Sequence, residues 1–160
     1  MVGQDIQLKF TYYKICVIIP TYNNELTLKN VIDSVLNYTT NILVVNDGSS
    51  DSTLQIISRY SNIKSVSYTP NKGKGHALRT GFKKAVDAGY EYAITIDSDG
   101  QHFAKDIPAF INVLDEKGPC LIIGARNMNQ VSVPGKSSFG NRFSNFWFWA
   151  FINSSIEERH

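Results

Sequence analysis

Short apolar runs alternate along this chain with stretches in which apolar residues recur at helical spacing. The runs are nearly continuous and rich in β-branched residues, which is typical of strands buried on both faces of a parallel sheet. We expect strands at 15–19, 42–45, 65–68, 92–96 and 120–123.

Between these runs, apolar residues return every three or four positions, the period of one helix face. The groups are Leu28, Val31, Ile32, Val35 and Leu36; Leu54, Ile56 and Ile57; Leu78, Phe82 and Val86; and Ile107, Phe110, Ile111 and Leu114. This order predicts an α/β fold with a mainly parallel, Rossmann-like sheet and helices on both faces. Ligands should bind at the carboxyl ends of its strands.

Composition narrows the classes of protein. The 160 residues suffice for one domain, and the formal charge of +2 gives no argument for a nucleic-acid surface. No apolar run approaches the roughly 18 residues of a membrane-spanning helix, and no signal-peptide pattern opens the chain. Cys16 and Cys120 each lie in an apolar run, so we expect buried free thiols and a cytoplasmic protein.

Two carboxylates end the fourth apolar run, at Asp97 and Asp99. Side chains at i and i+2 of an extended chain point to the same side, so both can reach one cation. Oxygen ligands suit Mg²⁺, Mn²⁺ or Ca²⁺, and two carboxylates leave room for substrate phosphates. A polar turn after a strand explains the same residues equally well.

The loop at 46–52 carries a carboxylate that turn formation does not explain. Gly48 suits a tight turn, and Ser50 or Asp51 suits the cap of the following helix. Asp47 precedes that cap at a strand end, where we expect it to accept hydrogen bonds from a base or ribose.

The segment 71–79 joins the third strand to a helix and combines glycines and cations with a helix amino terminus. Backbone donors and the helix dipole there favour a diphosphate. Neither this segment nor the Gly-Lys-Ser at 135–137 completes a P-loop, so a P-loop nucleotidase is not expected. His76 and His102 are expected to be surface or packed residues rather than ligands.

Four motifs in this order resemble family 2 glycosyltransferases with the GT-A fold. They are Val-Ile-Ile-Pro-Thr-Tyr-Asn at 17–23, Val-Val-Asn-Asp-Gly-Ser at 44–49, Asn-Lys-Gly-Lys-Gly at 71–75 and Asp-Ser-Asp-Gly-Gln-His at 97–102. The Asp-x-Asp-x-Gln form and the Ile-Gly-Ala-Arg at 123–126 are similar to the polyprenyl-phosphate (dolichyl-phosphate) mannosyl- and glucosyltransferase branch. The resemblance covers about 14–150.

The resemblance implies a site for a nucleoside-diphosphate sugar, such as a UDP- or GDP-sugar. Asp97, Asp99 and Gln101 would hold Mg²⁺ or Mn²⁺. Arg126 and Arg142 would meet donor or acceptor phosphate and complete the catalytic set with Asp97 and Asp99. The nucleotide-sugar contacts would be Pro20, Thr21, Tyr22, Asn23, Glu25, Asp47, Gly48, Lys74, Gly75, Asp97 and Ser98.

One position departs from the family pattern. Many relatives have Glu directly after Tyr-Asn, whereas here Asn24 precedes Glu25, which weakens the expectation that Glu25 contacts the base.

The resemblance also implies a single displacement with inversion at the anomeric carbon, with cations stabilising the departing nucleoside diphosphate. A polyprenyl phosphate needs no general base, because the second pKa of a phosphate monoester is about 6. The alternative acceptor, a sugar hydroxyl of an envelope polysaccharide, needs a carboxylate base. We expect the lipid acceptor, and one catalytic domain over 1–160 truncated at its acceptor side and working in the cytoplasm or at the inner membrane face.

The stretch 139–152 is rich in aromatic residues, and Phe139, Phe143, Phe146 and Ala150 share one face at helical spacing. We expect a helix there that either packs in the core or lies at a membrane surface and guides a polyprenyl tail.

Two other classes stay open. An Asp-x-Asp-Gly after an apolar strand also occurs in haloacid dehalogenase-like phosphatases, with Asp97 as nucleophile, although there it usually follows the first strand. A non-catalytic nucleotide-sugar or calcium-binding module is the other. An EF-hand loop is excluded, because Gly100 comes too early and Pro108 occupies the position of the bidentate Glu.

Overall fold

The computed structural model describes residues 2–100, 104–124 and 147–151. Its elements are α1 (Val2–Tyr12), β1 (Ile15–Thr21), α2 (Leu28–Leu36), β2 (Ile42–Asp47), α3 (Thr53–Ile57), β3 (Lys64–Tyr68), α4 (Lys74–Asp87), β4 (Tyr92–Thr95), the 3₁₀ turn η1 (Ala104–Asp106), α5 (Ile107–Lys117), β5 (Ile122–Gly124) and β6 (Trp147–Phe151). Within the described ranges, no helix has both the length and the apolar character needed to cross a membrane.

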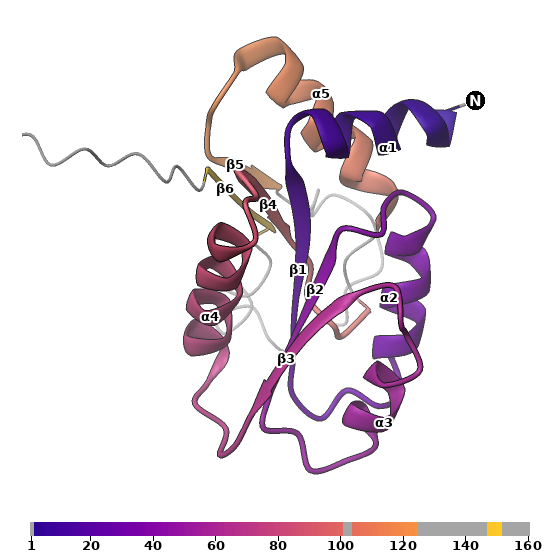
Figure 1. Cartoon of the computed structure of the whole chain (residues 1–160), viewed down its shortest axis with the longest axis vertical. Coiled ribbons are helices and arrows are strands. Elements are labelled where there is room, and N and C mark those ends of the chain that lie inside the picture. Colours follow the sequence, from indigo (N-terminus) through magenta and orange to yellow (C-terminus); the bar gives the residue numbers. More distant parts are fainter. Residues whose placement is uncertain (1, 101–103, 125–146, 152–160) are drawn as a thin grey trace, which may run out of the picture.

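The strands form one six-stranded sheet in the order β3-β2-β1-β4-β6-β5 (Figure 1). β1 pairs in parallel with β2 and β4, and β2 pairs in parallel with β3. β6 runs antiparallel to both β4 and β5. The chain builds outward from β1 to β3 and then returns to β4 on the other side of β1. Such a switch in direction leaves a crevice at the carboxyl ends of the two central strands.

β1 is buried along its whole length, which explains its continuous apolar sequence. Ile15, Val17 and Ile19 pack in one core cluster with residues of α1, α2, α3 and α5, whereas Cys16 and Ile18 pack in a second cluster with residues of α4. Figure 1 shows α4 on one side of the sheet and α2 and α3 on the other. The predicted placement of helices on both faces is confirmed.

The two cysteines are free but differ in burial. Cys16 is fully buried, and burial raises the pKa of its thiol to about 12, so the thiol stays protonated at neutral pH. Cys120 is only partly buried, because the strand expected from 120 starts at Ile122. The strand begins later than expected because Gly118 caps the end of α5 and Pro119 has no backbone N–H to donate to a neighbouring strand. The expectation of burial is wrong for Cys120.

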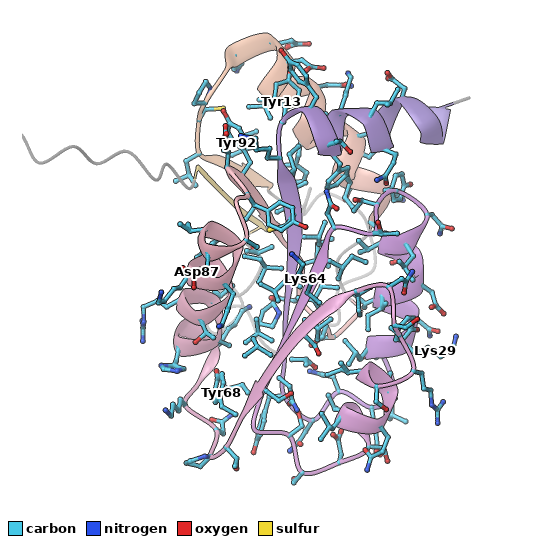
Figure 2. All side chains as sticks on the ribbon, viewed as in Figure 1. Tyr13, Lys29, Lys64, Tyr68, Asp87 and Tyr92 are labelled. Atoms are coloured by element: carbon cyan, nitrogen blue, oxygen red, sulfur yellow. The ribbon has the colours of Figure 1, made fainter. Side chains whose placement is uncertain are left out.

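α1 has no counterpart among the expected elements. Its signal is the pair Ile6 and Phe10, which lie one helical turn apart and are buried in the core. α1 and the residue that follows it are tied to α5, because Lys9 Nζ and Tyr13 OH each donate to the Asp115 carboxylate at 2.5 Å. Figure 2 shows Tyr13 and Tyr92 at the opposite end of the sheet from Tyr68.

The helix expected over 139–152 is wrong for 147–151, which form strand β6. Five consecutive apolar residues, four of them aromatic, suit a strand as well as a helix, and here their backbone pairs with β4 on one side and β5 on the other. The rest of that stretch lies outside the described residues.

α4 meets the sheet through small residues. Those buried are Ala77, Gly81 and Ala85, whereas Leu78, Phe82 and Val86, the residues that predict the helix, are only partly buried. A Cβ on Gly81 would lie 2.6 Å from Ile18 Cγ2, so the helix lies this close because position 81 has no side chain. In α3, the predicted Leu54 is 51% exposed, since this five-residue helix buries Ile56 and Ile57 instead.

We predict that Gly81→Ala lowers the free energy of unfolding, as measured by urea denaturation. The added methyl must displace Ile18 Cγ2, and such overpacking costs about 1–3 kcal/mol. The higher helix propensity of Ala offsets at most about 1 kcal/mol of this cost. We therefore expect the free energy of unfolding to fall by about 1 kcal/mol.

Gly75→Ala in the first turn of the same helix is the matched control. A Cβ there would meet only Arg79 Nη1, at 3.7 Å, which is ordinary contact, so its stability should equal or exceed that of the parent. A Gly81→Ala protein as stable as Gly75→Ala would contradict the close approach of α4 to the sheet.

Candidate functional site

The carboxyl ends of β1, β2 and β4 and the amino end of α4 surround a cleft of about 360 Å³. It lies at the switch between β1 and β4, where a parallel sheet is expected to bind ligands, and its volume is in the range of small-molecule sites. The lining residues are Pro20, Thr21, Tyr22, Asn24, Asp47, Asn71, Gly73, Lys74, Ala77, Asp97, Ser98 and Asp99.

The structure brings most of the predicted site residues together here. Those that line the cleft are Pro20, Thr21, Tyr22, Asp47, Lys74, Asp97, Ser98 and Asp99. Those that do not line it are Asn23, Glu25, Gly48 and Gly75. Gln101, Arg126 and Arg142 lie outside the described residues. Lining residues that sequence reasoning missed are Asn24, Asn71, Gly73 and Ala77.

Asn23 and Glu25 join the loop after β1 to the loop after β2. Asn23 N donates to Ser49 Oγ at 2.9 Å, and Asn23 Oδ1 accepts from Ser50 N at 2.8 Å. Glu25 Oε2 accepts from Ser52 N at 2.8 Å. Asn23 has a φ of 52°, in the left-handed region that Asn tolerates better than most residues. In this structure both side chains are therefore used to fix the shape of the cleft wall.

Asn24, the residue that departs from the family pattern, links the first loop to the loop after β4. Its Nδ2 donates to Ser98 Oγ at 2.8 Å and to Tyr22 O at 3.1 Å, and its backbone N donates to Thr53 Oγ1 at 3.1 Å. Ser98 Oγ in turn donates to Pro20 O at 3.0 Å. The buried Ser98 is thus held against β1.

Asp97 and Asp99 flank Ser98 and line the same cleft, although residues 98 and 99 form a turn and not the extended chain that the prediction assumed. The Asp97 side chain is 18% exposed and accepts a hydrogen bond from Lys74 Nζ at 2.7 Å. Nowhere in the described ranges do three or more His, Cys, Asp or Glu side chains gather as a metal site would need. Two carboxylates nevertheless fit a hard divalent cation that keeps most of its positions for water and ligand oxygens.

Asp47 is the last residue of β2 and is buried. Its Oδ1 accepts from Lys72 N at 2.8 Å and its Oδ2 accepts from Asn71 Nδ2 at 3.0 Å, so the carboxylate holds the β3–α4 loop against β2. Each carboxylate oxygen can accept a second hydrogen bond, so Asp47 can hold this loop and still accept a hydrogen bond from a base or ribose. Burial, followed by the nearby Asp47 charge, raises the pKa of Tyr68 to about 12.

Gly48 is required by the turn after β2 rather than by the cleft. Its φ is 73°, and a Cβ there would lie 2.6 Å from Asn71 N. Any side chain at this position would push the β3–α4 loop away from Asp47.

The amino end of α4 borders the cleft through its N-cap residue Gly73, with a φ of 87°, and through Lys74. Backbone N–H groups of a first helical turn and the positive end of the helix dipole favour an anion. His76 packs edge-on against the Tyr68 ring with centroids 5.1 Å apart, which agrees with the packed role expected of it. Figure 2 shows Tyr68 between β3 and α4.

Thr21 lines the cleft, and its hydroxyl oxygen is a buried polar atom. Within the part of the chain that the structure describes, its Oγ1 has no hydrogen-bond partner. Buried polar atoms are nearly always paired, so this atom indicates a place for a ligand or water.

A family model described as "Glycosyl transferase family 2" matches residues 16–157. The UDP-N-acetylglucosamine–dolichyl-phosphate N-acetylglucosaminyltransferase of Methanococcus voltae is 35% identical over 132 residues, which are 72% of this chain and 53% of the relative. Poly-beta-1,6-N-acetyl-D-glucosamine synthase of Staphylococcus epidermidis is 35% identical over 131 residues, 76% of this chain and 31% of the relative. The chain spans about half the length of the first curated relatives it matches.

Among solved structures, S. aureus TarS 1-349 in complex with UDP-GlcNAc is similar to this chain with a TM-score of 0.60 and 27% identity. The match covers 75% of this chain and 36% of TarS. Together with the family match, it confirms the predicted GT-A fold.

The hydrogen bonds of Asp51 yield a test of the loop network. Its Oδ1 accepts from Thr53 N at 3.0 Å and its Oδ2 accepts from Glu25 N at 3.1 Å. Burial alone would raise the pKa of this carboxyl, but the hydrogen bonds together outweigh burial and lower the pKa below its ordinary 3.8. A lowered folded-state pKa means that the ionised carboxylate stabilises the fold above pH 3.8, and that this stabilisation is lost as pH falls through the folded pKa.

We predict that Asp51→Asn lowers the free energy of unfolding at pH 7 by about 1 kcal/mol. The amide has one acceptor oxygen in place of two and no charge, so it cannot accept from both Thr53 N and Glu25 N as the carboxylate does. The difference from the parent should persist down to pH 3.8 and shrink below it, as measured by urea denaturation across this range. Asp87→Asn, on α4 (Figure 2), is the control and should change stability by less than about 0.5 kcal/mol. A deficit in Asp51→Asn that stays constant below pH 3.8 would refute the role of the charge.

Proposed function

The chain belongs to glycosyl transferase family 2, and on that premise we propose that it binds a nucleoside-diphosphate sugar in the cleft and transfers the sugar with inversion. The observation that carries the proposal is the convergence of all four motif segments on one cleft at the switch point of the sheet. The buried Thr21 hydroxyl, which needs a partner, supports a ligand there.

The lining suggests how the donor lies. Pro20, Tyr22 and Asp47 would hold the base and ribose at the end of the cleft formed by β1 and β2. Lys74 and the first turn of α4 would face the diphosphate, because both offer positive charge. Asp97, at the end of the neighbouring β4, would then lie on the diphosphate side.

A divalent cation, Mg²⁺ or Mn²⁺, follows from the charge of the cleft. Three carboxylates, those of Asp47, Asp97 and Asp99, line it against the single ammonium of Lys74 among the described residues. A diphosphate would be repelled by this negative lining unless a cation came with it. Bound by Asp97 and Asp99, the cation would supply stabilisation of the charge that develops on the leaving nucleoside diphosphate.

For the acceptor we propose a polyprenyl phosphate, with UDP-N-acetylglucosamine as the first donor to test. The M. voltae relative is named for this donor and for dolichyl phosphate. The phosphate is already an anion at neutral pH and can attack the anomeric carbon without a general base. Arg126 and Arg142 stay predicted phosphate contacts. Since a polyprenyl chain lies in a membrane, the protein would act at a membrane surface.

The alternative acceptor is a sugar hydroxyl, and the S. epidermidis relative, named as a polysaccharide synthase, supports it. Family membership sets aside the phosphatase with Asp97 as nucleophile. Transfer of the sugar to either acceptor would exclude a binding module that has no transfer activity.

We predict that the parent chain binds UDP-N-acetylglucosamine in the presence of Mn²⁺ but not in the presence of a chelator, as measured by calorimetric titration. Asp99→Ala should weaken this binding by at least about tenfold, because changes around a metal site typically cost 10- to 100-fold. Asp87→Asn should bind like the parent. If Asp99→Ala binds as tightly as the parent in excess Mn²⁺, the metal assignment is wrong, and if the parent binds neither UDP- nor GDP-sugars, the donor site is wrong.

We further predict that label from the donor sugar enters a solvent-extractable lipid when polyprenyl phosphate is supplied. Dephosphorylated polyprenol is the control and should accept at least about 100-fold less, since a neutral alcohol lacks the ionised nucleophile and has no assigned base. Incorporation into a glycan acceptor, with none into lipid, would decide for the hydroxyl alternative.

A further inference from the structure

The cleft contains an ion pair that a metal–diphosphate complex would have to break. Lys74 Nζ lies 2.7 Å from Asp97 Oδ2. The lysine side chain is 57% exposed and the aspartate side chain 18%, so the cation has open solvent to move into and the carboxylate has little. The pair joins the first residue of α4 to the loop that follows β4.

A divalent cation and the Lys74 ammonium compete for the same carboxylate. A metal ion that binds Asp97 Oδ2 at ordinary coordination distance would stand within a few ångströms of the ammonium, where like charges repel strongly. The lysine has a flexible four-carbon stem and loses little by moving through solvent. The metal ion can therefore replace the ammonium at Asp97 without any movement of the backbone.

We propose that Lys74 is the internal counter-cation of Asp97: it neutralises this carboxylate in the free protein, and it moves to the diphosphate when a metal ion takes Asp97. The proposal rests on the proposed function, because it assumes that metal and diphosphate meet in this cleft. It adds a positioning role for Lys74 in the free protein and a reason for ordered loading of the site.

Cooperative binding follows from this exchange. A metal ion that binds alone must break the ion pair, and the displaced ammonium then gains no new partner. A diphosphate that binds alone meets the negative lining. When both bind, the pair is broken once and the released ammonium gains a phosphate partner. By linkage, the diphosphate raises the metal affinity as much as the metal raises the diphosphate affinity. Lys74 thus makes the site favour the metal–diphosphate complex over either component.

The test is Mn²⁺ titration of the whole chain followed by electron paramagnetic resonance of the free ion, without nucleotide and then with UDP. Lys74→Gln should bind Mn²⁺ alone about fivefold more tightly than the parent, the size expected when a competing, partly exposed ion pair is removed. The gain in Mn²⁺ affinity that UDP produces should be smaller in Lys74→Gln than in the parent. Lys74→Arg, which keeps the charge, should behave like the parent.

Lys83→Gln is the matched control, because it removes the same charge from the same helix and breaks the pair of Lys83 with Asp87 at 3.3 Å. It should leave Mn²⁺ affinity unchanged, and thermal denaturation without metal should show that all variants are folded.

Equal Mn²⁺ affinity of Lys74→Gln and the parent overturns the inference, while donor binding by the parent would leave the proposed function standing. If Lys74→Gln and Lys83→Gln gained Mn²⁺ affinity equally, the cause would be a general charge effect, and the inference would also be overturned. Absence of Mn²⁺ binding in every protein, with and without UDP, overturns both the inference and the metal assignment.

Discussion

The cleft depends on the hydrogen bonds that hold the loop after β1 between the loops after β2 and β4. Three consecutive residues, Asn23, Asn24 and Glu25, bond to segments on both sides of that loop. Irregular backbone at buried strand ends must find partners for its N–H and C=O groups, and here side chains of neighbouring loops provide many of them. The parallel strands fix where the loops start, but these side chains fix the walls that a ligand would meet.

The order of strands and helices was predictable because burial on both sheet faces leaves a continuous apolar run, as in β1. The packing face of α4 and the form of β6 have no comparably clear pattern in the sequence. The small residues of α4 carry little hydrophobicity, so the pattern pointed to Leu78 and its neighbours instead of Gly81. β6 pairs with strands distant in sequence, and its aromatic run fits both helical and extended periods, so only the sheet decides its form.

The position of the site was predictable for a different reason: the carboxyl ends of parallel strands meet at one edge, and polar residues follow three of them. The direction of each side chain was not. Asn23 and Glu25 carry the same chemistry as ligand-binding residues, but a left-handed backbone at Asn23 accompanies bonds to the next loop. Asp47 lines the cleft and also supports the β3–α4 loop. Residue type alone cannot separate these two uses.

A cleft lined by three carboxylates is at first sight a poor receptor for a diphosphate, yet its charge makes binding conditional. A positive lining would bind any phosphate, with or without metal. Here Lys74 pairs with Asp97, so on our proposal a lone metal would have to displace it, and a lone diphosphate would gain little from an ammonium already engaged. On the proposed function, the two ligands together would balance the charges of the described residues that line the cleft. The arrangement would therefore favour the complex in which the leaving group that we propose is already stabilised for departure.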